Sequence, residues 1–216
     1  AKMNGYYYSV NDYYKELFGR KVYKISLNAG MSCPNRDGRI GTGGCIFCSE
    51  GGSGDFASSS LLSVKNQIDY GIEKISKKYT GDSYIAYFQA FTNTYAPVDR
   101  LKKIFTEAIQ DNRICGLSIA TRPDCLEDDK IELLAELNRI KPVWIELGLQ
   151  TINETTARYI RRGYPLAVFE DAVARLNAVD IPVVVHVIVG LPGENANDNL
   201  ACAKYLSRLN INGVKI

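Results

Sequence analysis

The chain contains 216 residues, of which 46% are hydrophobic and 23% are charged, and this composition excludes an intrinsically disordered protein. The formal net charge of +2 and the absence of a long basic run exclude a strongly basic nucleic-acid binder, while transient contact with RNA stays open. No stretch approaches the roughly 18 apolar residues that span a bilayer, and no signal-like segment opens the chain, so we expect a cytoplasmic protein without membrane contact.

Strand and helix patterns alternate along the chain. Residues 6–18 are rich in tyrosine and predict an amphipathic helix that either packs against the end of the main fold or stacks on bases. Strands are predicted over residues 21–29, 84–90, 116–121, 143–149, 182–190 and 213–216. Helices are predicted over about 63–79, from Pro97, over 126–140, after Asn153, over 166–180 and over about 196–209.

Strands that alternate with helices indicate parallel strands joined by right-handed crossovers. The predicted fold is therefore α/β, a partial (β/α)6 barrel over residues 21–216, preceded by a lead-in segment over residues 1–20. A closed eight-unit barrel needs about 250 residues, and this chain has too few strands for one; the sixth predicted strand is only beginning where this sequence stops. In such folds the functional site lies at the C-terminal ends of the strands, where the βα loops meet.

Three of the six cysteines, Cys33, Cys45 and Cys48, lie in one glycine-rich loop, CPNRDGRIGTGGCIFC, directly after the first predicted strand. In a reducing compartment, clustered cysteines are typical of metal ligands. Three thiolates suit an iron–sulfur cluster that keeps one iron open, whereas a structural zinc needs a fourth ligand. Cys125 is that fourth candidate because it follows the third strand at the same end, so spacing alone leaves both metals open.

Further motifs follow the cysteine loop in order: FQAFTNTYAP (88–97), ATRPD (120–124), ELGLQT (146–151), RRGY (161–164) and HVIVGLPGE (186–194). Together they resemble the radical S-adenosylmethionine (SAM) superfamily, and more narrowly its bacterial subfamily related to the Elongator catalytic subunit, which has a long first cysteine gap. The resemblance implies that the three thiolates hold a [4Fe–4S] cluster whose fourth iron binds SAM. An external flavodoxin- or ferredoxin-type donor would supply one electron, and SAM cleavage would yield a 5′-deoxyadenosyl radical.

The resemblance also implies contacts with the cofactor from Phe47, Ala90, Phe91, Thr92, Gln150, Arg162, His186 and Gly190. Phe47 matches an aromatic residue beside the adenine, and Gly190 lets the backbone approach it. Gln150 and Arg162 match residues that bind the ribose and the carboxylate in coproporphyrinogen-oxidase-like relatives. Residues 90–92 replace the usual Gly-Gly-Glu segment, and His186 replaces a ribose-contacting aspartate, with a buried core histidine as the alternative.

Five polar residues near strand ends are candidates for substrate binding: Asn93, Tyr95, Arg122, Asp124 and Glu146. For Arg122, pairing with Glu146 or Asp124 is an alternative that suits it as well as ligand binding does. Within the subfamily, the chain is similar in kind to queuine lyase, which cleaves queuine to 7-aminomethyl-7-deazaguanine, and this implies a small-molecule substrate. The alternatives are a radical SAM enzyme that modifies tRNA or another macromolecule, and a zinc-structured binding module.

Overall fold

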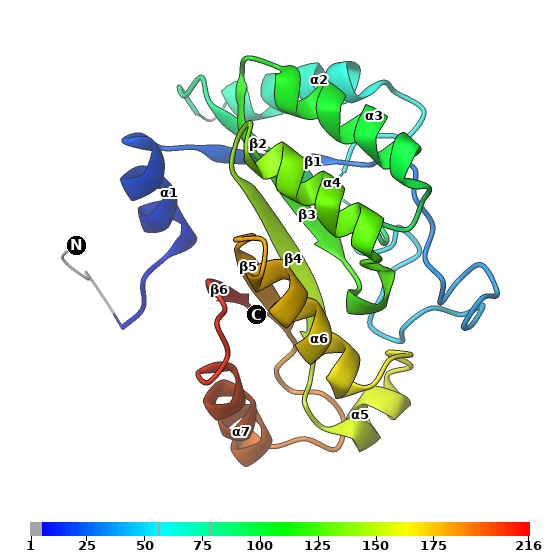
Figure 1. The fold of residues 1–216 in the computed structure, drawn as a ribbon. Helices are drawn as coiled ribbons and strands as arrows, with labels where there is room; N and C mark the ends of the chain where they lie inside the picture. The colour runs from blue at the N-terminus through cyan, green and yellow to red at the C-terminus, as the bar shows by residue number, and fades with distance from the viewer. Residues whose placement is uncertain (1–5, 56, 78) are drawn as a thin grey trace.

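The computed structural model describes residues 6–55, 57–77 and 79–216, and it contains one sheet of six parallel strands (Figure 1). The strands are β1 (Tyr23–Leu27), β2 (Tyr84–Phe88), β3 (Ile114–Thr121), β4 (Val143–Gln150), β5 (Val183–Val187) and β6 (Gly213–Lys215). Their order in the sheet is their order in the sequence, so β1 and β6 are the edges of the sheet. The predicted α/β partial barrel is therefore confirmed.

Helices other than α1 cover the outer face of this sheet (Figure 1). The helices are α1 (Val10–Phe18), α2 (Val64–Ser76), α3 (Val98–Gln110), α4 (Asp128–Asn138), α5 (Glu154–Tyr159), α6 (Leu166–Asn177) and α7 (Ala196–Leu206). Helix α2 packs against β1, α3 against β3, α4 against β4, and α6 against β4 and β5. None of the helices in the described part of the chain is both long and apolar enough to cross a bilayer.

Several predicted boundaries differ from the structure by a few residues, and two of these differences have a clear physical cause. The first helix begins at Val10 and not at residue 6, because the side chain of Ser9 accepts a hydrogen bond from the N–H of Asp12 and caps the helix there. Strand β2 ends at Phe88, two residues before the predicted end, since the chain then turns and Phe91 takes up a left-handed backbone with φ 62°.

Successive residues of each strand point to opposite faces of the sheet. The outward residues, such as Ile25, Leu117 and Ile145, are buried between the sheet and the helices and form the main core. The inward residues at the corresponding level include Lys24, Ser118 and further polar side chains. The outer face therefore supplies the hydrophobic stabilisation, and the inner face is left for polar chemistry.

Helix α1 covers the inner face at the N-terminal ends of the strands, apart from the other helices (Figure 1). Its Tyr13, Tyr14 and Phe18 surround Trp144 of β4, with ring centroids 5.4–6.3 Å from the indole. The indole N–H of Trp144 donates to the hydroxyl of Tyr13 at 3.1 Å. The structure thus places Tyr13 and Tyr14 in packing contacts at the end of the barrel opposite to the cysteine loop.

Truncation of this aromatic anchor tests the role of α1. Trp144→Ala removes a side chain that is 3% exposed, and we expect it to lower the free energy of unfolding by about 3–5 kcal/mol in urea denaturation. The control Tyr159→Ala removes an exposed ring of α5 and is expected to change it by less than about 0.5 kcal/mol. A loss no larger than that of the control would show that α1 is not anchored by Trp144.

Candidate functional site

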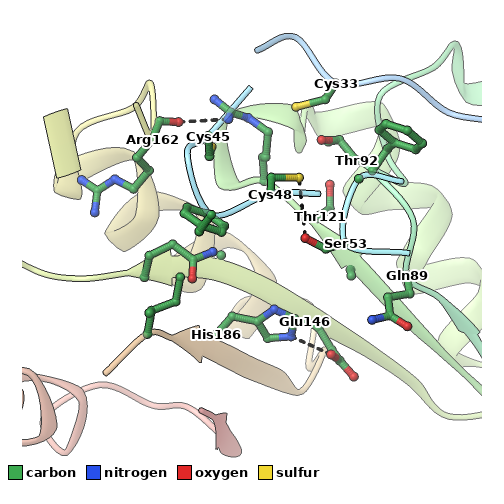
Figure 2. Close-up of a pocket in the computed structure, with 18 of the residues that line it drawn as sticks. Cys33, Cys45, Cys48, Ser53, Gln89, Thr92, Thr121, Glu146, Arg162 and His186 are labelled. Carbon is green, nitrogen blue, oxygen red and sulfur yellow. Dashed lines mark hydrogen bonds and ion pairs between the residues drawn. The ribbon is translucent and has the colours of Figure 1, made fainter. Parts of the chain in front are cut away.

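A cavity of about 320 Å³ lies over the C-terminal ends of the strands, at the level of the cysteine loop. The predicted site residues that line it are Cys33, Cys45, Phe47, Cys48, Phe91, Thr92, Arg122, Glu146, Gln150, Arg162 and His186. Figure 2 shows the cysteines on one side of the cavity, with Glu146 and His186 on the other. Residues that are far apart in the sequence therefore meet at one site, as the parallel topology predicts.

The cysteine loop is fixed by its own hydrogen bonds and by the turn that follows α5. The N–H of Cys48 donates to the carbonyl of Cys45 at 3.1 Å, which turns the C-x-x-C segment back on itself. The side-chain amide of Asn35 donates to the carbonyl of Arg161 at 2.6 Å, and the N–H of Ile46 donates to the carbonyl of Ile160 at 3.1 Å. The loop is thereby held against the neighbouring segment over the strand ends.

The three thiols are free, and two of them accept hydrogen bonds. The amide of Asn35 donates to Cys45 Sγ at 3.3 Å, and the hydroxyl of Ser53 donates to Cys48 Sγ at 3.6 Å. Burial raises the pKa of the Cys45 thiol, while the Asn35 hydrogen bond and the charge of Arg122 oppose that rise. Hydrogen bonds to sulfur stabilise thiolates, which are the form that binds iron.

This donor set fits an iron–sulfur cluster. Within the described residues, no three His, Cys, Asp or Glu side chains come close enough to share a single metal ion. In a [4Fe–4S] cube each thiolate binds a separate iron, and Cys33, Cys45 and Cys48 all line the same side of one cavity, where they could hold such a cluster. Cys125, considered above as a fourth zinc ligand, is buried outside this cavity, and burial raises its pKa to about 12.

On the inner face of the barrel, the carboxylate of Glu146 is the centre of a polar network. It accepts hydrogen bonds from His186 Nε2 at 2.6 Å, from Tyr87 and Ser118 at 2.8 Å each, and from Lys24. Lys215 Nζ lies 3.3 Å from the same carboxylate and 2.8 Å from the Tyr87 hydroxyl. Each of the six strands thus supplies one member of the network.

The charge state of Glu146 follows from this arrangement. Burial alone would raise the pKa of this carboxyl, but the His186 hydrogen bond and the charges of Lys24 and Lys215 outweigh burial and hold the pKa well below its ordinary value. Burial, together with the neighbouring carboxylate, raises the pKa of Tyr87. Glu146 is therefore an anion and Tyr87 a neutral donor at neutral pH.

Arg162 lines the cavity, but its guanidinium is already occupied. It donates to the backbone carbonyls of Leu149 at 3.0 Å, Thr151 at 2.6 Å and Tyr164 at 3.0 Å, and it pairs with Glu154 at 3.3 Å. The residue is 1% exposed. In this structure the Arg162 guanidinium therefore binds the chain around the end of β4 and not a ligand carboxylate, which was the expected contact.

Arg122 follows one of the two alternatives left open by the sequence. It pairs with Asp124 at 2.8–2.9 Å and donates to the carbonyl of Arg162 at 2.9 Å, and it does not pair with Glu146. Asp124 is therefore engaged with its neighbour outside the cavity.

Four further predicted residues do not line the cavity: Ala90, Asn93, Tyr95 and Gly190. Asn93 is fully buried, and its amide donates to the carbonyls of Phe88 and Ala120, so it ties β2 to β3. The tight turn after Phe91 carries Tyr95 to a separate surface pocket beside Arg39. Asn93 and Tyr95 were thus wrongly placed in the site by their position near a strand end.

Sequence reasoning missed several cavity residues. Lys215, Tyr87, Gln89, Ser53 and Arg36 line the cavity but were not predicted. Arg36 Nη2 donates to the carbonyls of Cys48 at 3.2 Å and Ser49 at 2.5 Å, which fixes the C-x-x-C turn. For Tyr87 and Lys215, the alternation of side chains along their strands could have predicted this position, because a residue between two outward apolar residues points into the barrel.

Comparison with known proteins agrees with this geometry. The family described as the Radical SAM superfamily matches residues 36–206. The uncharacterized protein YtqA of Bacillus subtilis is 43% identical over 210 residues, which are 97% of this chain and 65% of YtqA. MJ0486 of Methanocaldococcus jannaschii is 39% identical over 207 residues, which are 94% of this chain and 63% of that protein.

The solved structure of archaeal Methanocaldococcus infernus Elp3, with its N-terminus deleted, superposes with a TM-score of 0.58 at 17% identity. The superposition covers 85% of this chain and 41% of Elp3, and it shows a shared fold. The chain spans less than two thirds of the length of the curated relatives named above.

The ionisation of Glu146 gives a test by acid unfolding. The unfolded chain takes up a proton at Glu146 near its ordinary pKa of 4.5, whereas the folded protein does so only at a much lower pH. The stability that this carboxylate contributes is therefore complete above the ordinary pKa and is lost as the pH falls toward the folded pKa. Between about pH 5 and 3, we expect the free energy of unfolding to fall more steeply in the wild type than in Glu146→Gln.

The measurement is urea denaturation of both proteins across this pH range. Glu132→Gln, which changes an exposed glutamate of α4, is the matched control and should keep the wild-type slope. Equal slopes in all three proteins would contradict the depressed pKa of Glu146.

Proposed function

Because the chain belongs to the radical SAM superfamily, for which a [4Fe–4S] cluster and SAM are the cofactors, we propose that it is an enzyme acting on a small polar substrate. The observation that supports this proposal is the position of three free thiols around one cavity, above a polar floor. When bound, the cluster supplies one electron that cleaves SAM to a 5′-deoxyadenosyl radical. The electron comes from an external donor, for which we propose the flavodoxin or ferredoxin type.

Cys33, Cys45 and Cys48 are the proposed ligands of the cluster. Asn35 and Ser53 donate hydrogen bonds to two of these sulfurs, and such bonds would stabilise the negative charge of the thiolates that hold the cluster. The partial burial of the thiols limits the access of water to the site.

SAM is proposed to lie between the cysteine loop and the ends of β2 and β4. The N–H of Phe91 donates to the carbonyl of Gly52 at 2.9 Å, which fixes the segment after β2 against the cysteine loop. Gln150 has a left-handed backbone with φ 68°, and its side chain lines the cavity at the end of β4. Phe47 offers an aromatic face for the adenine, and Gln150 offers an amide for the ribose hydroxyls.

A small polar substrate fits the residues beneath the cysteines. Gln89 and His186 line the cavity there and offer hydrogen-bonding groups on rigid strands. Queuine, cleaved to 7-aminomethyl-7-deazaguanine, is the specific substrate indicated by the sequence resemblance and is the first compound to assay.

The cluster assignment predicts the behaviour of cysteine variants. After anaerobic reconstitution with iron and sulfide, the wild type should bind about four irons per chain. It should then form 5′-deoxyadenosine from SAM in the presence of dithionite. Cys33→Ala, Cys45→Ala and Cys48→Ala should each lose the cluster and this product. Cys202→Ala, which changes a buried cysteine of α7, should keep both. Zinc without iron or sulfide, or equal loss in Cys202→Ala, would contradict the proposal.

Substrate class is tested in the same assay by mass spectrometry. Formation of 7-aminomethyl-7-deazaguanine together with 5′-deoxyadenosine would identify queuine as a substrate. Product formation only with tRNA, accompanied by tRNA binding that weakens steeply with salt, would contradict a small-molecule substrate.

A further inference from the structure

Two lysines from opposite edges of the sheet meet at the carboxylate of Glu146. Glu146 and Lys215 line the floor of the cavity, and Lys24 pairs with this carboxylate without lining the cavity itself. Lys24 of β1 pairs with Oε1 of Glu146, and Lys215 of β6 lies 3.3 Å from Oε2 of the same carboxylate. Both ammonium groups also lie over the ring of Tyr87, at 4.5 Å and 4.9 Å from its centroid. We call Lys24 and Lys215 the floor lysines.

The floor carries more positive than negative charge. Glu146 is the acid that pairs with the floor lysines, and no second acid of the described residues lies within ion-pair distance of either one. Elsewhere in the cavity wall Arg122 pairs with Asp124 and Arg162 pairs with Glu154, while Arg36 donates to backbone carbonyls of the cysteine segment. At the floor, two lysines share one acid.

Glu146 cannot neutralise both ammonium groups. Its oxygens also accept hydrogen bonds from Ser118, Tyr87 and His186, so its acceptor sites are shared among several donors. The carboxylate is 0% exposed, whereas the side chains of Lys24 and Lys215 are 29% and 45% exposed. Both lysine side chains are thus partly exposed, while the carboxylate is not.

A purely structural ion pair does not need the second lysine. One ammonium balances one carboxylate, and placing another cation on a confined inner surface costs desolvation and like-charge repulsion without a compensating anion. A ligand with an acidic group would supply this missing negative charge beside the floor lysines.

We propose that the substrate of this cavity carries a carboxylate or phosphate group that binds between Lys24 and Lys215. That the ligand is the substrate rests on the function proposed above, whereas the anion site itself stands on the geometry of the floor. Queuine has no acidic group, so this inference favours a small acid over queuine within the same reaction class.

Calorimetric titration of the reconstituted full chain tests this inference. Saturating SAM is present throughout, so that added anions do not occupy the position of the SAM carboxylate. Inorganic phosphate and malonate are titrated separately at constant ionic strength. We expect at least one of them to bind the wild type, and its affinity to fall about tenfold in Lys24→Met and in Lys215→Met. Phosphate binding alone would indicate a phosphate ester, and malonate binding alone a carboxylic acid.

Matched variants separate charge from folding. Each single variant leaves one lysine to balance Glu146, and circular dichroism checks its fold. Lys103→Met, which removes an exposed lysine of α3, should bind the anion as the wild type does, and Lys215→Arg should retain binding. Absence of anion binding in the wild type, or an affinity in both floor-lysine variants as high as that of the wild type, would overturn the inference. The titration requires no turnover, so failure to form 5′-deoxyadenosine would overturn the proposed function alone.

Discussion

The buried carboxylate of Glu146 determines the arrangement of the barrel interior. The sheet is open, and its edge strands β1 and β6 are not paired with each other in the described structure. Lys24 and Lys215 from these two strands nevertheless converge on the same carboxylate. The two edge strands are therefore connected by ion pairs to one buried carboxylate and not by hydrogen bonds of the sheet. Removal of that anion would leave the two ammonium groups facing each other in a low-dielectric interior.

The two faces of the sheet have separate functions. Outward residues pack against the helices and supply the apolar burial that stabilises the fold. On the inner face, α1 packs around Trp144 at the N-terminal ends of the strands, and the cavity lies at their C-terminal ends beside the cysteine loop. This division allows the site to carry charged groups that a hydrophobic core would not tolerate.

Much of this architecture could be predicted from local sequence patterns. The strand and helix periods predicted the partial barrel, and the spacing of Cys33, Cys45 and Cys48 predicted that these residues lie together, as they do beside one cavity. The partners of Glu146 could not be predicted, because Lys24 and Lys215 lie near opposite ends of the sequence and meet only through the register of the strands.

The roles of Arg162 and Tyr95 could not be predicted from residue type and position along the sequence, because local backbone conformation and hydrogen bonding decide them. An arginine suits a ligand carboxylate, but Arg162 is saturated by the backbone carbonyls around the end of β4. Tyr95 follows a strand end, but the left-handed turn at Phe91 directs the chain away from the cavity. In both cases the conformation of a few backbone residues decided the role of the side chain.

We propose that Cys33, Cys45 and Cys48 hold a cluster with one iron open to SAM. Electron paramagnetic resonance of the anaerobically reconstituted and reduced protein is the direct test of this assignment. We predict the signal of a reduced [4Fe–4S] cluster whose g-values shift when SAM is added, because SAM binds the open iron. A signal that is unchanged by SAM, or the absence of any cluster signal in protein that contains zinc, would contradict the account.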